Sequence, residues 1–90
     1  MPKLTDKEIE SSLAKLENWT ILEGQLHRKF AFKDFREAMS FVTKVALIAE
    51  SMDHHPDIDI RYNKVILNVL THSAGGLTEK DFSLAQTIDS

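Results

Sequence analysis

The chain has 90 residues, of which 42% are hydrophobic and 28% charged, a size and composition typical of one small globular domain with a single core. Its formal net charge of −3 gives no broad cationic surface, which argues against nucleic acid as a direct partner. The sequence has no cysteine, no apolar signal segment at its start and no apolar run of membrane-spanning length. We therefore expect a single cytoplasmic domain over residues 1–90, without disulfides and without membrane contact.

The first predicted element is an amphipathic helix from about Asp6 to Glu17. Thr5 and Glu8 form a capping-box pattern at its start, and apolar residues then recur at every third or fourth position. The segments Trp19–Leu22 and Leu26–Phe32 follow on either side of a turn that contains glycine, and apolar residues alternate with others in the second segment. This pattern predicts a β-hairpin.

A long central helix is predicted to begin after Asp34, because Asp34 and Glu37 mark a helix start and apolar residues then recur every three or four positions. The apolar surface of this helix is wider than one packed stripe requires. We therefore expect the helix and at least one sheet edge to contact a second subunit, with the helix contributing Phe41, Val45 and Ile48.

Pro56 limits the length of the central helix. It disfavours helical geometry at His55, which places the helix end near residues 53 and 54. A second hairpin is predicted from Ile58–Tyr62 and Val65–His72, which are joined by a turn at Asn63–Lys64.

The last predicted element is a helix that follows the Gly75–Gly76 loop. Thr78 is placed to cap it, and Phe82, Ala85 and Ile88 recur at helical spacing. The resulting order, α-β-β-α-β-β-α, predicts an α+β fold in which helices cover one face of a four-stranded antiparallel sheet.

Three of the four histidines lie close to the predicted ends of elements. Glu50 and His54 are four residues apart on the central helix, so the carboxylate can hydrogen-bond one ring nitrogen and select the tautomer that presents the other. His55 is the next residue, and His72 closes the last predicted strand. Asp81, in the first turn of the last helix, is expected near the same edge. These residues together are suited to proton transfer.

Other interpretations of the same residues remain open. His54 and His55 are also explained as a solvated helix end, and Asp81 as an acidic residue favoured at a helix start. The histidines with Asp53, Asp57, Asp59 or Asp81 form an alternative metal site. The metal site is disfavoured because adjacent histidines tend to point apart and no H-x-x-x-H pair is present.

The spacing of several polar residues resembles the signature of the pterin-4a-carbinolamine dehydratases. The matching residues are Glu50, His54, His55, Pro56, Tyr62, His72 and Asp81. The segments FAFKDFREAMSFVTKVALIAE, YNKV and GGLTEKDF also look like that family, so the resemblance covers most of the chain from about Trp19 onward. One departure is Ile58, where some members carry tryptophan, so an aromatic pocket wall is not implied here.

The resemblance implies both an activity and an assembly. Members of the family dehydrate 4a-hydroxytetrahydropterins, in tetrahydrobiopterin recycling, to quinonoid dihydropterins, without a metal or an organic cofactor. By position, His54, His55 and His72 would be the catalytic or pterin-contacting histidines. Glu50 and Asp81 would support them, and Pro56 and Tyr62 would belong to the substrate-binding surroundings. Family members assemble through sheet edges and central helices, which implies a homodimer or homotetramer.

The chemistry explains why histidines suffice. An imidazolium that donates a proton to the hydroxyl on C4a helps the C–O bond break, and general acid-base help of this kind is worth about 10² to 10⁴-fold. We expect His54 to be the leading acid-base residue, with no division of roles assigned to His55 and His72. Two alternatives are a binding module that stabilises a protein partner, as animal relatives do for a transcription factor dimer, and a pterin-binding assembly role.

Overall fold

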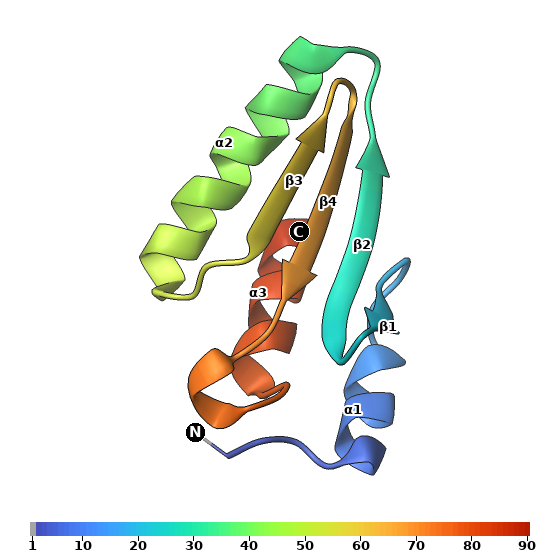
Figure 1. Cartoon of the computed structure of the whole chain (residues 1–90), viewed down its shortest axis with the longest axis vertical. Helices are drawn as coiled ribbons and strands as arrows, with labels where there is room; N and C mark the ends of the chain where they lie inside the picture. The colour runs from blue at the N-terminus through green and yellow to red at the C-terminus, as the bar shows by residue number, and fades with distance from the viewer. Residues whose placement is uncertain (1) are drawn as a thin grey trace.

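The computed structural model describes residues 2–90, which form three α-helices, four strands and one short 3-10 helix (Figure 1). In chain order the elements are α1 (Asp6–Leu13), β1 (Thr20–Leu22), β2 (Gln25–Ala31), α2 (Phe35–Met52), β3 (Asp57–Arg61), β4 (Lys64–Val69), the 3-10 helix η1 (His72–Ala74) and α3 (Glu79–Asp89). The strands form one antiparallel sheet in the order β1-β2-β4-β3. The α+β fold expected from the sequence is confirmed.

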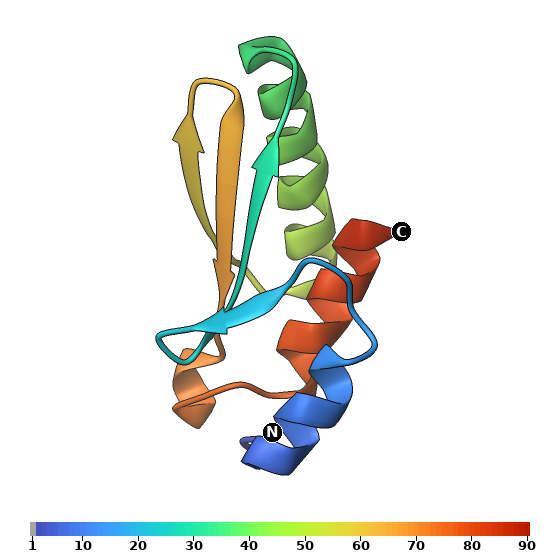
Figure 2. The ribbon, with the colours of Figure 1, turned by 90° about the vertical axis from the view of Figure 1, so that its right-hand side faces the viewer.

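The core lies between the sheet and the helices, which cover the same face of the sheet (Figure 2). In β4, Val65, Leu67 and Val69 alternate toward the helices and are fully buried, as is Leu26, which pairs with Val69 across β2 and β4. The helices contribute several buried side chains to this core: Ala38, Val45 and Ala49 from α2, and Phe82, Leu84, Ala85 and Ile88 from α3. The central strand β4 therefore buries one face, as its alternating pattern requires, whereas all three residues of the edge strand β1 are exposed.

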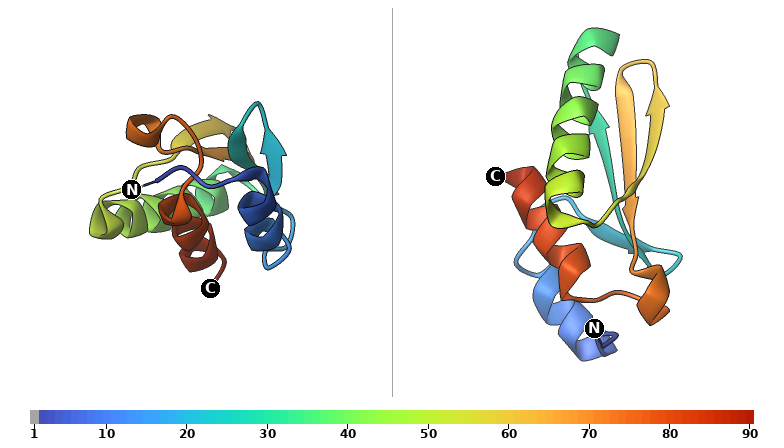
Figure 3. Two further views of the ribbon diagram at one scale, coloured as in Figure 1. Left: turned by 90° about the horizontal axis from the view of Figure 1, so that it is seen from below. Right: turned by 90° about the vertical axis from the view of Figure 1, so that its left-hand side faces the viewer.

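The outer face of the sheet carries polar residues. His27 lies there opposite Asn68, and its Nδ1 is 2.9 Å from the Asn68 Oδ1. No helix covers this face in the views of the ribbon (Figure 3). This fourth histidine, for which we predict no role, is therefore separated by the sheet from the helices.

The first helix is shorter than predicted. α1 ends at Leu13. The amides of Lys15 and Leu16 then donate to carbonyls three residues back, which is the hydrogen-bond pattern of a 3-10 turn at a helix end. Asn18 then takes a left-handed conformation with φ of 67°. Leu16 still packs against the core from this irregular segment.

The interface residues predicted on the central helix need correction. Val45 is fully buried within its own chain, so it is not available to a second subunit. Phe41 packs on Phe30 at 4.5 Å between ring centroids, and Ile48 is also partly buried against the core. The large exposed apolar side chains of α2 are Phe35 and Leu47, at 50% and 68%. The face we assigned to a partner is mostly the face that packs on the sheet.

Within residues 2–90, no helix is both long enough and apolar enough to cross a membrane.

Candidate active site

An open pocket of about 380 Å³ lies where α2 ends, β4 leads into η1, and α3 begins. It is lined by Asp53, His54, His55, Leu70, Thr71, His72, Ser73 and Lys80. In Figure 1, α2 ends about half-way down the molecule, above η1 and the start of α3. The pocket brings together the three histidines that the sequence singled out.

The helix end turns His54 inward. Asp53 takes the left-handed conformation, with φ of 50°, and the amide of His54 bonds the carbonyl of Ala49. This is the pattern that closes a helix when the residue after its last turn is left-handed. His54 consequently lies just beyond α2, rather than in its last turn as expected, and is only 8% exposed.

His54 is held by Asp81. Its Nε2 lies 2.6 Å from the Asp81 Oδ1, and the Asp81 side chain is fully buried. The other carboxylate oxygen, Oδ2, accepts the Thr78 amide and the Thr71 hydroxyl, both at 2.8 Å. A buried carboxylate requires such partners because its charge is costly to remove from water. Asp81 is also the third residue of α3 and completes a capping box with Thr78, so one side chain begins the helix and holds the histidine.

Glu50 pairs with a different histidine from the one predicted. Its Oε1 lies 2.7 Å from the Nε2 of His55, not from a nitrogen of His54. Both side chains are well exposed, at 76% and 56%, so water weakens this pair. The predicted Glu50–His54 pair is wrong because the left-handed turn at Asp53 ends the helical spacing on which it depended.

His72 does not lie on a strand. β4 ends at Val69, and His72 opens η1, within a loop closed by the bridge between Thr71 and Gly76. Gly75 follows η1 with φ of 72°, a conformation that favours glycine. The exposed His72 side chain thus stands at the rim of the pocket, on a tight loop.

Four residues of the family pattern lie outside this pocket's lining. Glu50 and Asp81 reach it only through their histidine partners, and Pro56 and Tyr62 make no such contact. Pro56 is partly buried beside His55 and extends the chain from α2 toward β3. Tyr62 lies in the β3–β4 turn, which is formed by Tyr62 and Asn63 rather than by Asn63 and Lys64. It has φ of 53° and is 66% exposed. Since five strand residues separate it from the pocket end, roughly 16 Å of chain intervenes. Within one chain, the structure does not bring Tyr62 to the histidines.

The hydrogen bond to Asp81 fixes which nitrogen of His54 is free. An ionised carboxylate only accepts, so Nε2 carries the proton toward Asp81. Over residues 2–90, the buried side-chain polar atom without a hydrogen-bond partner is Arg28 Nε. The Nδ1 of His54 makes no hydrogen bond to another described residue and is not such a buried atom, so it is open to solvent. The dyad presents Nδ1 as the atom that can give or take a proton.

Sequence reasoning missed two groups at this site. Thr71 continues the inward alternation of Val65, Leu67 and Val69, which is the signal that could have placed it beside the core. Lys80 lines the pocket, and its Nζ donates to the carbonyl of Asp53 at 3.3 Å, which joins the start of α3 to the end of α2.

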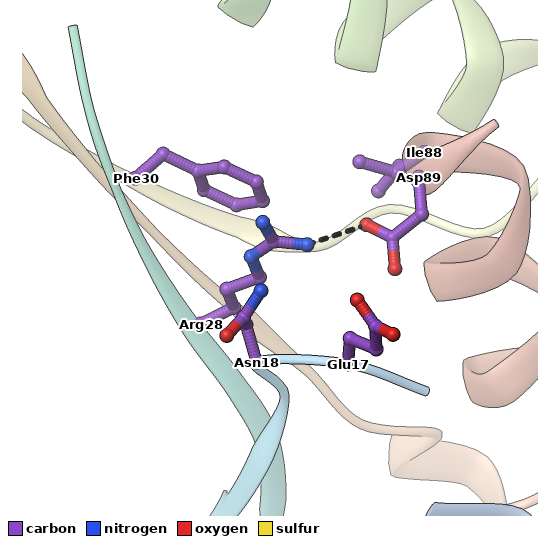
Figure 4. A pocket seen from close by; sticks show the side chains of 6 residues that line it. All are labelled: Glu17, Asn18, Arg28, Phe30, Ile88 and Asp89. Atoms are coloured by element: carbon purple, nitrogen blue, oxygen red, sulfur yellow. Dashed lines mark hydrogen bonds and ion pairs between the residues drawn. The ribbon is translucent and has the colours of Figure 1, made fainter. Parts of the chain in front are cut away.

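A second pocket, of about 300 Å³, lies between β2 and the end of α3 (Figure 4). There the Arg28 Nη1 bonds the Asp89 Oδ1 at 2.8 Å, and the Trp19 Nε1 donates to the Asp89 Oδ2 at 2.9 Å. The Arg28 guanidinium also covers the ring of Phe30, 4.3 Å from its centroid. These contacts tie the end of α3 to the sheet. No histidine lines this pocket, so we place the chemistry at the other one.

The part of the chain that the structure describes contains no group of three or more histidine, aspartate or glutamate side chains arranged to hold a metal ion. Each of the two shortest imidazole contacts is instead made to a carboxylate.

Comparison with known proteins identifies the family of the chain. The profile of the pterin 4 alpha carbinolamine dehydratase family matches residues 2–90. The chain belongs to this family. A Picosynechococcus protein provisionally named a pterin-4-alpha-carbinolamine dehydratase is 52% identical over 87 residues, covering 97% of this chain and 95% of its own length.

Solved structures extend the comparison to the fold of this dehydratase family member. The crystal structure of a transcriptional coactivator/pterin dehydratase from Brucella melitensis superposes with a TM-score of 0.91 at 38% identity, covering 97% of this chain and 95% of that one. A pterin dehydratase-like protein described as a RuBisCO assembly factor in the alpha-carboxysome has a TM-score of 0.64 at 21% identity, covering 79% and 82%. The second likeness shows only a shared fold.

Proposed function

We propose that this family member dehydrates a 4a-hydroxytetrahydropterin to a quinonoid dihydropterin and water, with His54 as the acid-base residue. The observation that carries the proposal is the His54–Asp81 dyad. Its Nε2 is engaged at 2.6 Å by a fully buried carboxylate, while its Nδ1 makes no hydrogen bond to another described residue, and His54 lines a pocket together with two further histidines. A carboxylate-oriented imidazole facing a pocket is suited to proton transfer near neutral pH.

The proposed reaction needs one proton delivered and one removed. The bond between C4a and its hydroxyl oxygen breaks as a proton reaches that oxygen, and water leaves. The N5 lone pair forms the new C4a=N5 double bond, and N5 then gives up its proton. The protons balance, so no oxidant, reductant or metal is consumed. The imidazolium of His54, donating from Nδ1, is suited to the first transfer, because hydroxide is a poor leaving group.

His55 and His72 reach the same pocket from different segments, and both are exposed. In this proposal they hold the pterin or accept the N5 proton, since a neutral imidazole can accept a hydrogen bond at one ring nitrogen and donate at the other. Glu50 supports His55 through their 2.7 Å contact. Lys80 stands beside them as a cation able to donate to a pterin oxygen.

A protein-binding role is the second candidate. The observation that favours it is the exposure of Phe35 and Leu47 on α2, which leaves large apolar side chains in water. The Brucella relative carries both descriptions, coactivator and dehydratase. Such a role would use the outer side of α2, whereas the dehydration would use the pocket beyond its end, so the two are separable by mutation.

A direct dehydration assay tests the first proposal. The 4a-carbinolamine is generated by an aromatic amino acid hydroxylase, and its conversion to the quinonoid dihydropterin is followed by absorbance with and without the protein. We expect catalytic amounts to accelerate the conversion well above its spontaneous rate. Conversion at the spontaneous rate with folded protein would overturn the proposal and leave protein binding as the better candidate.

A further inference from the structure

The Asp81 carboxylate has three hydrogen-bond partners, which come from three different segments. His54, beyond the end of α2, contacts Oδ1, while Oδ2 receives the Thr78 amide and the Thr71 hydroxyl. Thr71 lies between β4 and η1, and is only 7% exposed. It is the partner that fixes Asp81 to the sheet side of the pocket.

The directions of these hydrogen bonds can be assigned by counting protons. The Lys80 amide donates to the Thr78 hydroxyl oxygen at 3.2 Å, which leaves the Thr78 proton free to be donated onward. Thr71 gives its one proton to Asp81, because the carboxylate only accepts. The 2.9 Å contact between the two threonine hydroxyls therefore has Thr78 as donor and Thr71 as acceptor. The chain runs from the Lys80 amide through Thr78 and Thr71 to Asp81, and each hydroxyl donates once.

We infer that Thr71 is a positioning residue for the proposed dehydration: its hydroxyl fixes the Asp81 carboxylate and, through it, the ring and tautomer of His54. The inference rests on the proposed function. The Thr78 amide is a backbone group at the cap of α3, so its position is set by the helix. The Thr71 hydroxyl is the one side chain, other than His54, that donates to Asp81 among the described residues. Without it, Oδ2 keeps one donor, and the carboxylate is free to turn away from the plane that suits Nε2.

Other charged groups near the dyad do not replace this contact. Asp53, His55, His72 and Lys80 line the pocket on the side open to solvent, and Lys80 contacts the Asp53 carbonyl. Glu50 is engaged by His55. Thr71 is 7% exposed and Asp81 is fully buried, so their hydrogen bond is largely shielded from water although Thr71 also lines the pocket.

The test replaces the Thr71 hydroxyl while keeping the shape of the side chain. Thr71→Val removes the donor, and Thr71→Ser retains it. Thr87→Val is the matched control, because the Thr87 hydroxyl donates to the Ser83 carbonyl on the exposed side of α3. We expect Thr71→Val to lower kcat about tenfold with KM changed less than about twofold, since it removes a hydrogen bond to a charged group. Thr71→Ser should stay within about threefold of the wild type, and Thr87→Val should be unchanged.

A second readout does not depend on turnover. In spectra of the ¹⁵N-labelled imidazoles, neutral His54 should show its proton on Nε2 in the wild type, in Thr71→Ser and in Thr87→Val. Thr71→Val should show a mixture of the two tautomers. If the wild type proves inactive but this pattern appears, the proposed function fails and the role of Thr71 stands.

The contrary outcome is equally clear. A folded Thr71→Val with wild-type kcat and an unmixed His54 tautomer would overturn the inference. If the valine variant does not fold, Thr71→Cys takes its place, because a thiol keeps the bulk and is a weak donor. Its kcat should then fall clearly below that of Thr71→Ser, and equal values would overturn the inference.

Discussion

Asp81 and His54 are 27 residues apart in sequence, and a 2.6 Å hydrogen bond joins them across the ends of two helices. The carboxylate is fully buried, while the imidazole reaches the pocket. One residue therefore serves two structural purposes, since Asp81 caps α3 and orients the ring. The proposed catalysis depends on this pair more than on any other contact of the site.

Asp81→Asn should lower kcat by about 10²-fold. The asparagine keeps the shape but removes the charge that supports an imidazolium. Only its amide oxygen can accept, whereas both oxygens of Asp81 accept hydrogen bonds. Since the group is buried, we also expect a loss of about 1–3 kcal/mol in the free energy of unfolding. Steady-state assays and denaturant titration measure the two effects. Asp89→Asn is the control, because it removes the charge of a carboxylate that pairs with Arg28 away from the histidines. It should cost stability without lowering kcat.

Glu50→Gln should have a much smaller effect. Its partner is the exposed His55, and a solvent-exposed ion pair is worth so little that at most about a fivefold loss of kcat is expected. The same assay, run beside Asp81→Asn, ranks the two carboxylates. A larger loss of kcat for Glu50→Gln than for Asp81→Asn would show that the exposed Glu50–His55 pair, not the buried Asp81–His54 pair, carries the proton transfer.

Removal of metal ions should leave activity intact. In the proposed reaction the imidazoles need free nitrogens and protons for transfer, and ligation would occupy them. Turnover is measured after dialysis against a chelator, with metal analysis of the purified protein. Stoichiometric zinc or iron, together with activity that is lost on its removal and restored by its return, would favour a metalloenzyme instead.

The protein should self-associate through the exposed side of α2. Leu47 is 68% exposed and Phe35 is 50% exposed on this one helix, and burial of such side chains between copies is favourable. Light scattering at micromolar concentration should give a mass at least twice 10.2 kDa, and Leu47→Glu should shift it toward the monomer. A wild-type particle of 10.2 kDa would contradict this expectation.

The parts of the structure that local patterns determine could be predicted from the sequence. The start of α2 at Asp34 follows from its cap, and the inward face of β4 follows from the alternation of Val65, Leu67 and Val69. The helix order and the antiparallel sheet follow from these elements together. The width of the apolar face of α2 was misread, because a sequence does not show that Val45 packs on the sheet of its own chain.

The sequence predicted that His54, His55 and His72 meet, but not which carboxylate His54 and His55 each contact. The rule that residues four apart on a helix meet placed Glu50 beside His54, but it assumes that the helix continues. Asp53 takes a left-handed conformation, which directs His54 to Asp81 and leaves Glu50 to His55. The Thr71 contact joins segments ten residues apart through a loop, and no local pattern specifies such a contact.

The central claim is that His54 transfers the proton, and the most direct measurement is the turnover of the carbinolamine by His54→Ala and His72→Ala beside His27→Ala. His27 lies on the outer face of the sheet, so its variant controls for the loss of any histidine. We predict that His54→Ala loses at least about 10²-fold in kcat, that His72→Ala also loses turnover substantially, and that His27→Ala matches the wild type. Thermal unfolding of His72→Ala and His27→Ala should stay close to that of the wild type, whereas His54→Ala removes a partner of the buried Asp81 carboxylate and should lose about 1–3 kcal/mol in the free energy of unfolding. A folded His54→Ala that dehydrates the carbinolamine as fast as the wild type would contradict the claim, even if the dehydratase activity itself proved real.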